Sequence, residues 1–409
     1  MDLMPILRTL RKHKTAATLI VLETAVACAV VANALHLVGE RLRLLTRADG
    51  LPSADLLVVH AVPSGTQDDA QRRQITERDM AALRALPGVA SASFVNQMPY
   101  ANYNNFSGVS RDGGKDARNY HANMHAADAS VFKTLGLTFT EGGPFADGPT
   151  PHMQDARDDF SLVPRGVVIN TDLARALYPG ESALGKPLYM VKPFTIIGVS
   201  DNLPMTHPQA KPEGQRYAAL FQVRPSVGEG FHVLRVAPDT SAAARADLVQ
   251  RVRRTLMAVD PQRELARVEW LDQMRRDYDA SDRQMAWLMA AVTAVLLMVT
   301  TGGVVGLASF WVQQRTRMIG TRRALGATRG QVLRYFLAEN ALLTSMGLVL
   351  GMAGAYGLGL ALMRHWEVAP LPAWYLPAGA AVLLALGQLA AWIPARQATR
   401  VSPVVALRG

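Results

Sequence analysis

Cysteine is almost absent from this chain of 409 residues. The single cysteine, Cys28, stands inside a long apolar run, so one chain can form neither a disulfide nor a cysteine metal site. The chain also lacks a complete phosphate-binding loop. Residues 180–186 match the spacing G-x-x-x-x-G-K, but Pro187 follows where Mg²⁺ coordination needs a serine or threonine hydroxyl, and a strand-like segment comes next. We interpret this segment as a turn between a helix and a strand.

A catalytic group of side chains is equally hard to find. No Ser/His/Asp or paired-carboxylate arrangement stands out among the scattered polar residues. His121 and His125 have the i,i+4 spacing of zinc ligands on a helix, yet the surrounding residues read as an extended strand and offer no third ligand. We therefore predict no catalytic residue, no metal site and no cofactor-binding residue in this chain.

Charge is unevenly distributed along the sequence. The whole chain carries a net charge of +10, but residues 40–284 are neutral, with 29 Lys/Arg and 29 Asp/Glu. The excess of positive charge therefore flanks the long apolar runs, where it orients membrane helices instead of binding nucleic acid. We predict a membrane-embedded protein with no nucleic-acid partner.

Four long runs are nearly free of charge, and each is long enough to cross a hydrocarbon core of roughly 30 Å at about 1.5 Å per helical residue. They are residues 15–38, 285–311, 337–363 and 376–393. The first run is about twice as long as the apolar region of a signal peptide and has no small-residue cleavage site, which predicts an uncleaved membrane helix. Glu23 lies inside it, and an intramembrane carboxylate indicates either a functional site or pairing with an arginine near the cytoplasmic face.

Glycines recur along the second and third runs. They are Gly302, Gly303 and Gly306 in the second run, and Gly347, Gly351, Gly354, Gly357 and Gly359 in the third. Small residues let membrane helices approach closely, so these ridges predict packing within one subunit or, alternatively, a seam between two subunits.

A basic loop, residues 313–336, separates the second and third runs. Its arginines place it in the cytoplasm by the positive-inside rule. They are Arg315, Arg317, Arg322, Arg323, Arg329 and Arg334. Thr328 and Gln331 have the T-x-x-Q spacing of a capping box, which predicts that the next helix begins near Arg329.

A small apolar patch lies among these arginines. Ile319, Ala324 and Leu325 supply it, and Gly320 and Gly326 bracket one or two turns of helix. A short amphipathic element of this kind fits a groove in another protein. The alternative is a solvated charge run that only sets the topology.

The sequence R-T-R-M-I-G-T-R-R-A-L-G-A-T-R-G-Q-V-L in this loop resembles the cytoplasmic loop of the FtsX-like permeases, the MacB type of ABC transporter subunit. In that family the loop docks on a nucleotide-binding ATPase. The resemblance assigns coupling to nine residues: Ile319, Gly320, Thr321, Arg322, Arg323, Ala324, Leu325, Gly326 and Ala327.

The part between the first and second runs predicts short strands that alternate with helices, which is typical of an α+β domain. The expected strands are 56–60, 89–95, 120–126, 167–169, 194–199, 233–237 and 267–271, and the expected helices are 76–86, 129–135, 171–178 and 241–259. Residues 102–119 match no pattern. The segments H-A-A-D-A-S-V-F-K and V-V-I-N-T-D-L-A-R-A-L-Y-P-G-E resemble the periplasmic core of the same family, which implies a porter-like lobe with an inserted β-rich lobe.

The predicted fold is an α-helical membrane protein with four transmembrane helices and a large α+β extracytoplasmic domain on helical stalks. The predicted boundaries are 1–14 for a cytoplasmic segment, 15–48 for the first helix and stalk, 49–271 for the periplasmic MacB-like core domain, 272–284 for a second stalk segment, and 285–409 for an FtsX-like permease domain with coupling loop 313–336 and cytoplasmic tail 394–409.

The resemblance implies a non-catalytic permease subunit in the bacterial inner membrane, with both termini in the cytoplasm and the large domain in the periplasm. ATP and Mg²⁺ are then bound by a partner ABC ATPase. A second permease subunit, identical or paralogous, completes the complex, and a periplasmic adaptor or outer-membrane component is a further candidate partner. The expected activity is export of extracytoplasmic cargo by mechanotransmission. The alternatives are a lipoprotein-release subunit and an FtsX-like regulatory scaffold that activates an envelope enzyme.

Overall fold

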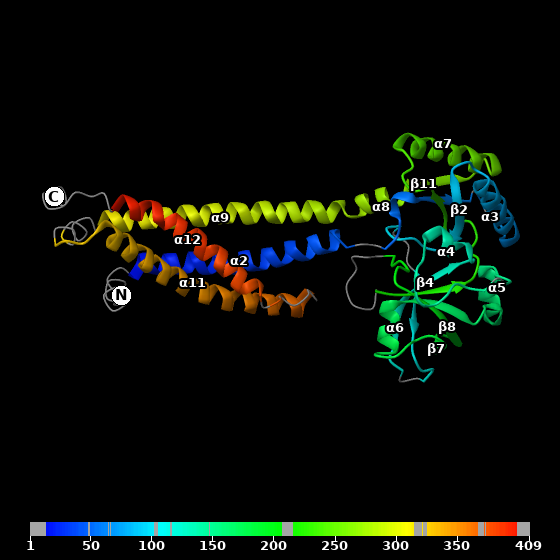
Figure 1. Cartoon of the computed structure of the whole chain (residues 1–409), viewed down its shortest axis with the longest axis horizontal. Coiled ribbons are helices and arrows are strands. Elements are labelled where there is room, and N and C mark those ends of the chain that lie inside the picture. The colour runs from blue at the N-terminus through cyan, green and yellow to red at the C-terminus, as the bar shows by residue number, and fades with distance from the viewer. Residues whose placement is uncertain are drawn as a thin grey trace. The chain divides into compact units, whose positions relative to one another are not determined.

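The computed structural model describes residues 14–47, 50–63, 65, 67–101, 105–114, 117–146, 148–206, 216–314, 321, 325–366, 372 and 374–398 (Figure 1). The chain divides into two compact units, one of residues 46–281 and one that joins residues 1–45 to residues 282–409. The first is an α/β unit and the second is helical.

The described part of the α/β unit is built on one 11-stranded mixed sheet. Its strands are β1 (Leu56–Val62), β2 (Val89–Val95), β3 (Phe106–Val109), β4 (Tyr120–Ala127), β5 (Phe139–Gly142), β6 (Gly166–Asn170), β7 (Pro187–Tyr189), β8 (Pro193–Ser200), β9 (Tyr217–Gln222), β10 (Phe231–Val236) and β11 (Glu264–Trp270). The order is β11-β1-β10-β2-β4-β9-β6-β8-β5, while β3 pairs with β4 and β7 with β8.

The helices of this unit are α3 (Asp69–Arg84), α4 (Ser130–Leu135), α5 (Met153–Asp158), α6 (Thr171–Leu177), α7 (Ala242–Val259) and α8 (Leu271–Tyr278), with 3₁₀ turns η1 (Ser53–Asp55) and η2 (Phe160–Leu162). Strand β1 shows how the layers form, because alternate side chains of a strand point to opposite faces. Leu57 and Val59 join the core beneath α3 and α7, which lie side by side in Figure 1, whereas Leu56 and Val58 join the core on the other face.

The sheet order confirms that the middle of the chain is inserted between the first and last parts. Strands β11, β1, β10 and β2 form the first lobe, and β4, β9, β6, β8 and β5 form the inserted lobe. The two groups meet at one residue pair, Val95 and Ala127. The insertion therefore continues the same sheet, and it also carries two helices, α5 and the predicted α6.

Most predicted elements lie within two or three residues of the observed ones, and the exceptions have local causes. Helix α3 begins at Asp69 rather than at Thr76, because Asp68 forms a capping box with Gln71. The unassigned segment 102–119 contains β3, which the four residues from Phe106 are too few to reveal by alternation. Strands β5 and β9 and helix α5 were also not predicted. Like β3, β5 and α5 are too short to show a clear period.

A buried ion pair ties α3 to the beginning of β11. Arg263 donates to both carboxylate oxygens of Asp79, with N–O distances of 2.6 and 2.9 Å. The side chains of both residues are at most 1% exposed. His232 of β10 places Nε2 3.2 Å from the same carboxylate. Three elements of the first lobe therefore meet at one shielded carboxylate.

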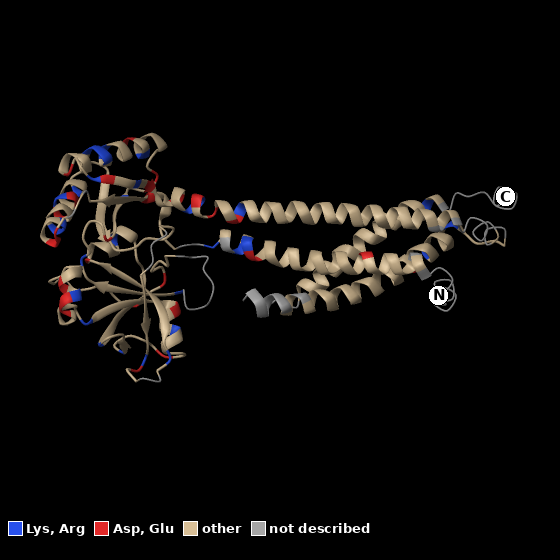
Figure 2. Ribbon diagram, turned by 180° about the vertical axis from the view of Figure 1, so that it is seen from behind, with Lys and Arg blue, Asp and Glu red and all other residues tan. Residues whose placement is uncertain are grey.

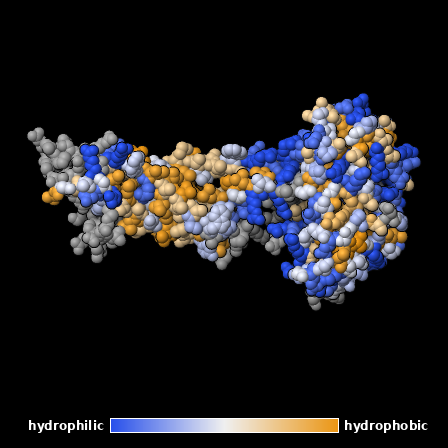
Figure 3. Space-filling model, viewed as in Figure 1, coloured by the Kyte–Doolittle hydropathy of each residue, from blue (hydrophilic) through white to orange (hydrophobic). Residues whose placement is uncertain are grey.

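The helical unit consists, in its described part, of α2 (Lys14–Leu45), α9 (Ala280–Gln314), α11 (Arg329–Trp366) and α12 (Tyr375–Ala398). All four are long and apolar enough to cross a membrane. Figure 2 shows that charged residues are rare along the middle of these helices, and Figure 3 shows apolar side chains on their surface. The four predicted spans are thus confirmed, although α11 continues past the expected end to Trp366.

The predicted stalk segment, residues 272–284, is not one continuous helix. Helix α8 ends at Tyr278, and α9 begins at Ala280 after a single turn residue, Asp279. Near the beginning of α9, Asp282 forms an ion pair with Arg41, which lies near the end of α2. This bridge joins the ends of α2 and α9 within the helical unit.

Glycines bring α11 against α2. A Cβ placed on Gly347 would lie 2.7 Å from Cβ of Thr24, and one on Gly351 would lie 2.5 Å from Cβ of Cys28. Both positions therefore require glycine for packing within one subunit, as one of the two interpretations predicts. A Cβ on Gly302, Gly306 or Gly357 would meet no described atom within 4 Å.

We expect Gly351→Val to destabilise the helical unit and Gly357→Val to leave it nearly unchanged. The first substitution forces α11 away from Cys28 and the carbonyl of Ala25, and overpacking of this kind typically costs about 1–3 kcal/mol. Thermal unfolding of the two variants in the same detergent measures the difference. Equal melting temperatures would contradict the close packing of α2 and α11.

Candidate functional site

The ends of α9, α11 and α12 meet in an apolar cluster that forms the base of the loop between α9 and α11. Val332 and Phe336 of α11 and Ala395 of α12 are buried there, and Val312 of α9 packs against them. The base of the loop therefore packs on three membrane helices at once.

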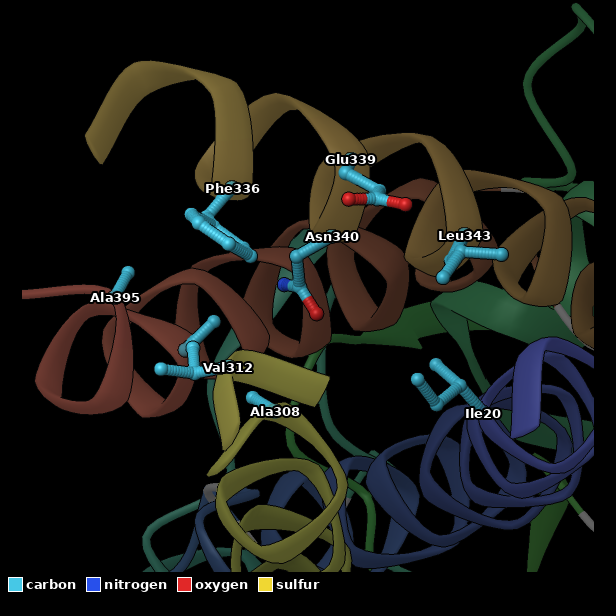
Figure 4. A pocket seen from close by; sticks show the side chains of 9 residues that line it. Ile20, Ala308, Val312, Phe336, Glu339, Asn340, Leu343 and Ala395 are labelled. Atoms are coloured by element: carbon cyan, nitrogen blue, oxygen red, sulfur yellow. The ribbon is translucent and has the colours of Figure 1, made fainter. Parts of the chain in front are cut away.

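A small pocket opens inside the helical unit next to this cluster. Figure 4 shows Phe336, Asn340 and Leu343 of α11 directed toward Val312 of α9 and Ile20 of α2. All four described helices contribute to its lining, with Ala308 from α9 and Ala391 and Ala395 from α12. The four helices thus converge beside the base of the loop.

In the described part of the loop, Leu325 is hydrogen-bonded to Thr321, and a capped helix start follows. The amide of Leu325 donates to the carbonyl of Thr321 at 3.0 Å. Gly326 follows with φ of +95°, a conformation that L residues other than glycine rarely adopt. Thr328 and Gln331 then form the predicted capping box, with N–O distances of 2.9 and 3.3 Å, and α11 begins at Arg329.

Leu325 is the most exposed large apolar side chain in the described part of the chain, at 83%. Thr321 and Gly326 are also exposed, and Ala327 is half-buried. The other five predicted coupling residues lie outside the described residues: Ile319, Gly320, Arg322, Arg323 and Ala324. The structure thus presents a leucine to solvent on a turn that is followed directly by Gly326 and by the capped start of α11.

Glu23, the predicted intramembrane site residue, lies on α2 against α9. A Cβ added to Gly303 would meet Oε1 of Glu23 at 2.1 Å, so glycine makes room for this carboxylate. Among the described residues no arginine forms an ion pair with Glu23, and Arg8 and Arg11 near the N-terminus lie outside them. Pairing of Glu23 with an arginine stays a prediction.

Sequence reasoning missed a second polar position in the membrane helices. Glu339 is 1% exposed and lines the pocket of Figure 4. Its neighbour Asn340 donates from Nδ2 to the carbonyl of Gly387 at 3.2 Å, which links α11 to α12. The carboxylate was visible in the sequence as an interruption of the third apolar run, and that signal alone marks an intramembrane functional candidate.

The phosphate-loop match at residues 180–186 and the histidine pair His121 and His125 have structural positions. Residues 180–186 form the turn between α6 and β7, where Lys186 pairs with Glu181 and lies 4.6 Å from the ring centre of Tyr178. His121 and His125 lie on strand β4, and Nε2 of His125 lies 2.8 Å from the carbonyl oxygen of Pro204. Burial lowers the pKa of His125 to about 4. In the described residues no cluster of three His, Cys, Asp or Glu side chains could hold a metal ion.

Two family profiles match the chain. The MacB-like periplasmic core domain matches residues 24–268, and the FtsX-like permease C-terminal domain matches residues 290–403. The first covers more than half of the chain.

Curated proteins and solved structures are also similar to the chain. Macrolide export ATP-binding/permease protein MacB 1/2 of Paracoccus denitrificans is 27% identical over 98% of this chain, which spans 58% of that protein. The uncharacterized ABC transporter permease YvrN of Bacillus subtilis is 25% identical, and 97% of this chain aligns with 96% of it. The periplasmic region of MacB from Actinobacillus actinomycetemcomitans aligns with 57% of this chain and 97% of its own, at 14% identity and a TM-score of 0.34.

Proposed function

The chain belongs to the FtsX-like, MacB-type permeases, and we propose that it is the membrane subunit of an ATP-binding-cassette complex that exports extracytoplasmic cargo. The subunit itself is non-catalytic in this proposal. One relative is named for macrolide export, but at 27% identity we extend to this chain only the export of cargo. The proposed location is the bacterial inner membrane.

The exposed Leu325 carries this proposal. Placing a leucine side chain in water is unfavourable, and it is 83% exposed here on a turn fixed by a hydrogen bond and a helix cap. An apolar side chain presented in this way fits a groove on a partner. We propose that the partner is the ATPase and that residues 319–327 form the coupling element.

The proposed mechanism is mechanotransmission. ATP-driven closure of the ATPases would pull the loop, and the cluster of Val312, Phe336 and Ala395 would pass the movement to α9, α11 and α12. Helix α9 runs unbroken from Ala280 to Gln314, and the ion pair of Arg41 with Asp282 would make α2 move with it. The two stalk ends would then carry the movement toward the α/β unit.

ATP and Mg²⁺ are proposed to bind to a separate ATPase chain. The supporting observation is that residues 180–186, the one phosphate-loop match in the sequence, form a surface turn with Lys186 engaged by Glu181. We further propose that two permease subunits, identical or paralogous, pair with two ATPases. A periplasmic adaptor or outer-membrane component would complete an exporter.

Purification of the tagged chain from native membranes tests this function. We expect an ABC ATPase to co-purify, together with a second permease subunit. Recovery of an envelope hydrolase instead would favour the regulatory scaffold, and recovery of lipoproteins would favour lipoprotein release. Absence of any ATPase under conditions that retain the second permease would contradict the proposal.

The proposed topology places the loop in the cytoplasm and the α/β unit in the periplasm. In a Cys28→Ala background, cysteines at Thr321 and at the 77%-exposed Val191 should react with a membrane-impermeant maleimide from opposite sides. In intact spheroplasts we expect Val191→Cys alone to be labelled, and after lysis we expect both. Labelling of both cysteines before lysis would contradict this topology.

We predict that the purified chain alone hydrolyses no ATP and that Lys186→Ala changes nothing in this respect. Pro187 supplies no hydroxyl for Mg²⁺, and the helix that would hold phosphates is replaced by β7. Phosphate release from purified protein in nanodiscs measures the activity. Hydrolysis that the Lys186→Ala variant abolishes would show that the nucleotide site is in this chain.

A further inference from the structure

The inserted lobe contains an apolar pocket that the proposed coupling does not use. It has a volume of about 410 Å³ and lies on the face of the sheet that carries α5. Met124 of β4 and Phe221 of β9 form its floor, and both are at most 7% exposed. Phe160 of η2 forms one wall, while Phe106 and Met190 close the other sides. Volumes of 300–1,000 Å³ are typical of pockets for drug-sized molecules.

Helix α5, which lines another side of this pocket, is held by ion pairs from two directions. Arg73 of α3 holds Asp155 of α5 with N–O distances of 2.6 and 2.9 Å, and Arg157 of α5 holds Glu229 at 2.7 Å. The amide of Met153 also donates to the carbonyl of Arg224 at 2.8 Å. The pocket is therefore preformed, and its wall is linked to the first lobe through α3.

The lining favours a ligand without charge. Arg157 is the one charged residue among the described lining residues, and Glu229 already neutralises it. An organic cation would find no carboxylate in the lining, and an anion would have to compete with Glu229. Among the uncharged polar residues of the lining, Asn105 and Ser107 can hydrogen-bond a neutral molecule, whereas Asn96 and His125 already bond to backbone groups.

Methionine is unusually frequent in this lining. Met124, Met153 and Met190 surround the pocket together with three phenylalanines. Unbranched thioether side chains adapt to ligands of different shape and contact aromatic rings favourably. This composition is suited to an apolar molecule and tolerates variation in its outline.

We propose that this pocket binds an uncharged, mainly apolar organic molecule of drug size and that such molecules are the cargo class of the permease. The assignment of these molecules as cargo rests on the proposed export function, whereas their binding to the pocket does not. Binding at this position would act on α5, whose ion pair with Arg73 passes the change to α3 of the first lobe.

Photolabelling with benzophenone tests the pocket directly, because benzophenone is neutral and apolar and its excited ketone reacts readily with methionine. The full chain is reconstituted in nanodiscs without an ATPase, irradiated over a range of benzophenone concentrations, and analysed by peptide mass spectrometry. We expect saturable adducts on Met124, Met153 or Met190 that the unreactive analogue benzhydrol displaces. Met257, 37% exposed on α7, should label without saturation. Labelling of the pocket by 4-benzoylbenzoate should be weaker by on the order of tenfold or more, because its charge would be desolvated.

Two variants separate binding from folding. Met190→Glu places a charge in the pocket and Ser107→Trp fills it, and each should reduce saturable labelling by on the order of tenfold. Leu184→Glu, at an exposed position of the same lobe outside the lining, should leave labelling unchanged. Non-saturable labelling in the wild type, or full labelling in both pocket variants, would overturn the proposal. If labelling is saturable but benzophenone does not change ATP hydrolysis by the complex, the pocket is a binding site and its ligand is not cargo.

Discussion

Replacing Leu325 by aspartate is expected to prevent the permease from retaining its ATPase. The side chain is 83% exposed in the free chain and would become the apolar anchor of the interface. Truncation of such an anchor typically costs about 2 kcal/mol or more, which corresponds to roughly a 30-fold loss of affinity, and a buried carboxylate adds a desolvation penalty. Membrane insertion should be intact, because the substitution changes no residue of the four spans.

The readout is co-purification of the ATPase and ATP hydrolysis of the complex in nanodiscs. Leu184→Asp provides the matched control, since it makes the same change at an exposed leucine of the α/β unit. A complex of Leu325→Asp with full assembly and full ATP turnover would show that this loop is not the coupling element.

Replacement of Arg323 by alanine should have a smaller effect on the same assembly. Arg323 lies outside the described residues, and the sequence places it at the rim of the apolar patch. Charges at a rim mainly change the association rate, so the loss should shrink as salt is added. A loss from Arg323→Ala that is as large as that from Leu325→Asp and independent of salt would indicate a buried role for the arginine.

Asp79→Ala is expected to destabilise the α/β unit more than any surface substitution in it. The carboxylate is fully buried and holds Arg263 through two hydrogen bonds. Removal of Asp79 leaves the buried guanidinium with only the more distant carboxylate of Asp260, 3.9 Å from Nε, and breaking a buried pair typically costs about 3–5 kcal/mol. In a unit of this size, a loss of that order lowers the melting temperature by roughly 10 °C.

Two comparisons isolate the buried charge as the cause. The double variant Asp79→Leu with Arg263→Met should recover much of the stability, because apolar side chains of similar volume can replace a buried ion pair. Asp247→Ala removes a surface pair with Arg251 and should change stability by at most about 0.5 kcal/mol. Thermal unfolding of the full chain measures all three variants. A loss for Asp79→Ala no larger than that for Asp247→Ala would contradict the structural role of the pair.

The sequence was most informative where a feature depends on neighbouring residues or on hydrophobic periodicity. The start of α11 at Arg329 follows from the side chains of Thr328 and Gln331 within one turn. The membrane helices follow from apolar length, and the turn at 180–186 follows from Pro187. Helix α3 shows the limit of this approach, because the sequence predicts its start at Thr76 and not at Asp69. The capping residues Asp68 and Gln71 lie ahead of any clear apolar period.

The sequence by itself determined the four membrane helices, the charge asymmetry around them and the basic loop with Leu325, since apolar length, charge and capping are local properties of the chain. Only the tertiary structure decided which distant residues meet. Asp79 and Arg263 are 184 positions apart, and Gly351 contacts Cys28 across two different helices. The pocket in the inserted lobe also needed the fold, because β3, β4, α5 and β9 each contribute only one to three of its lining residues. Such sites depend on strand order and helix packing, which arise from burial across the whole unit and leave no periodic signal in one segment.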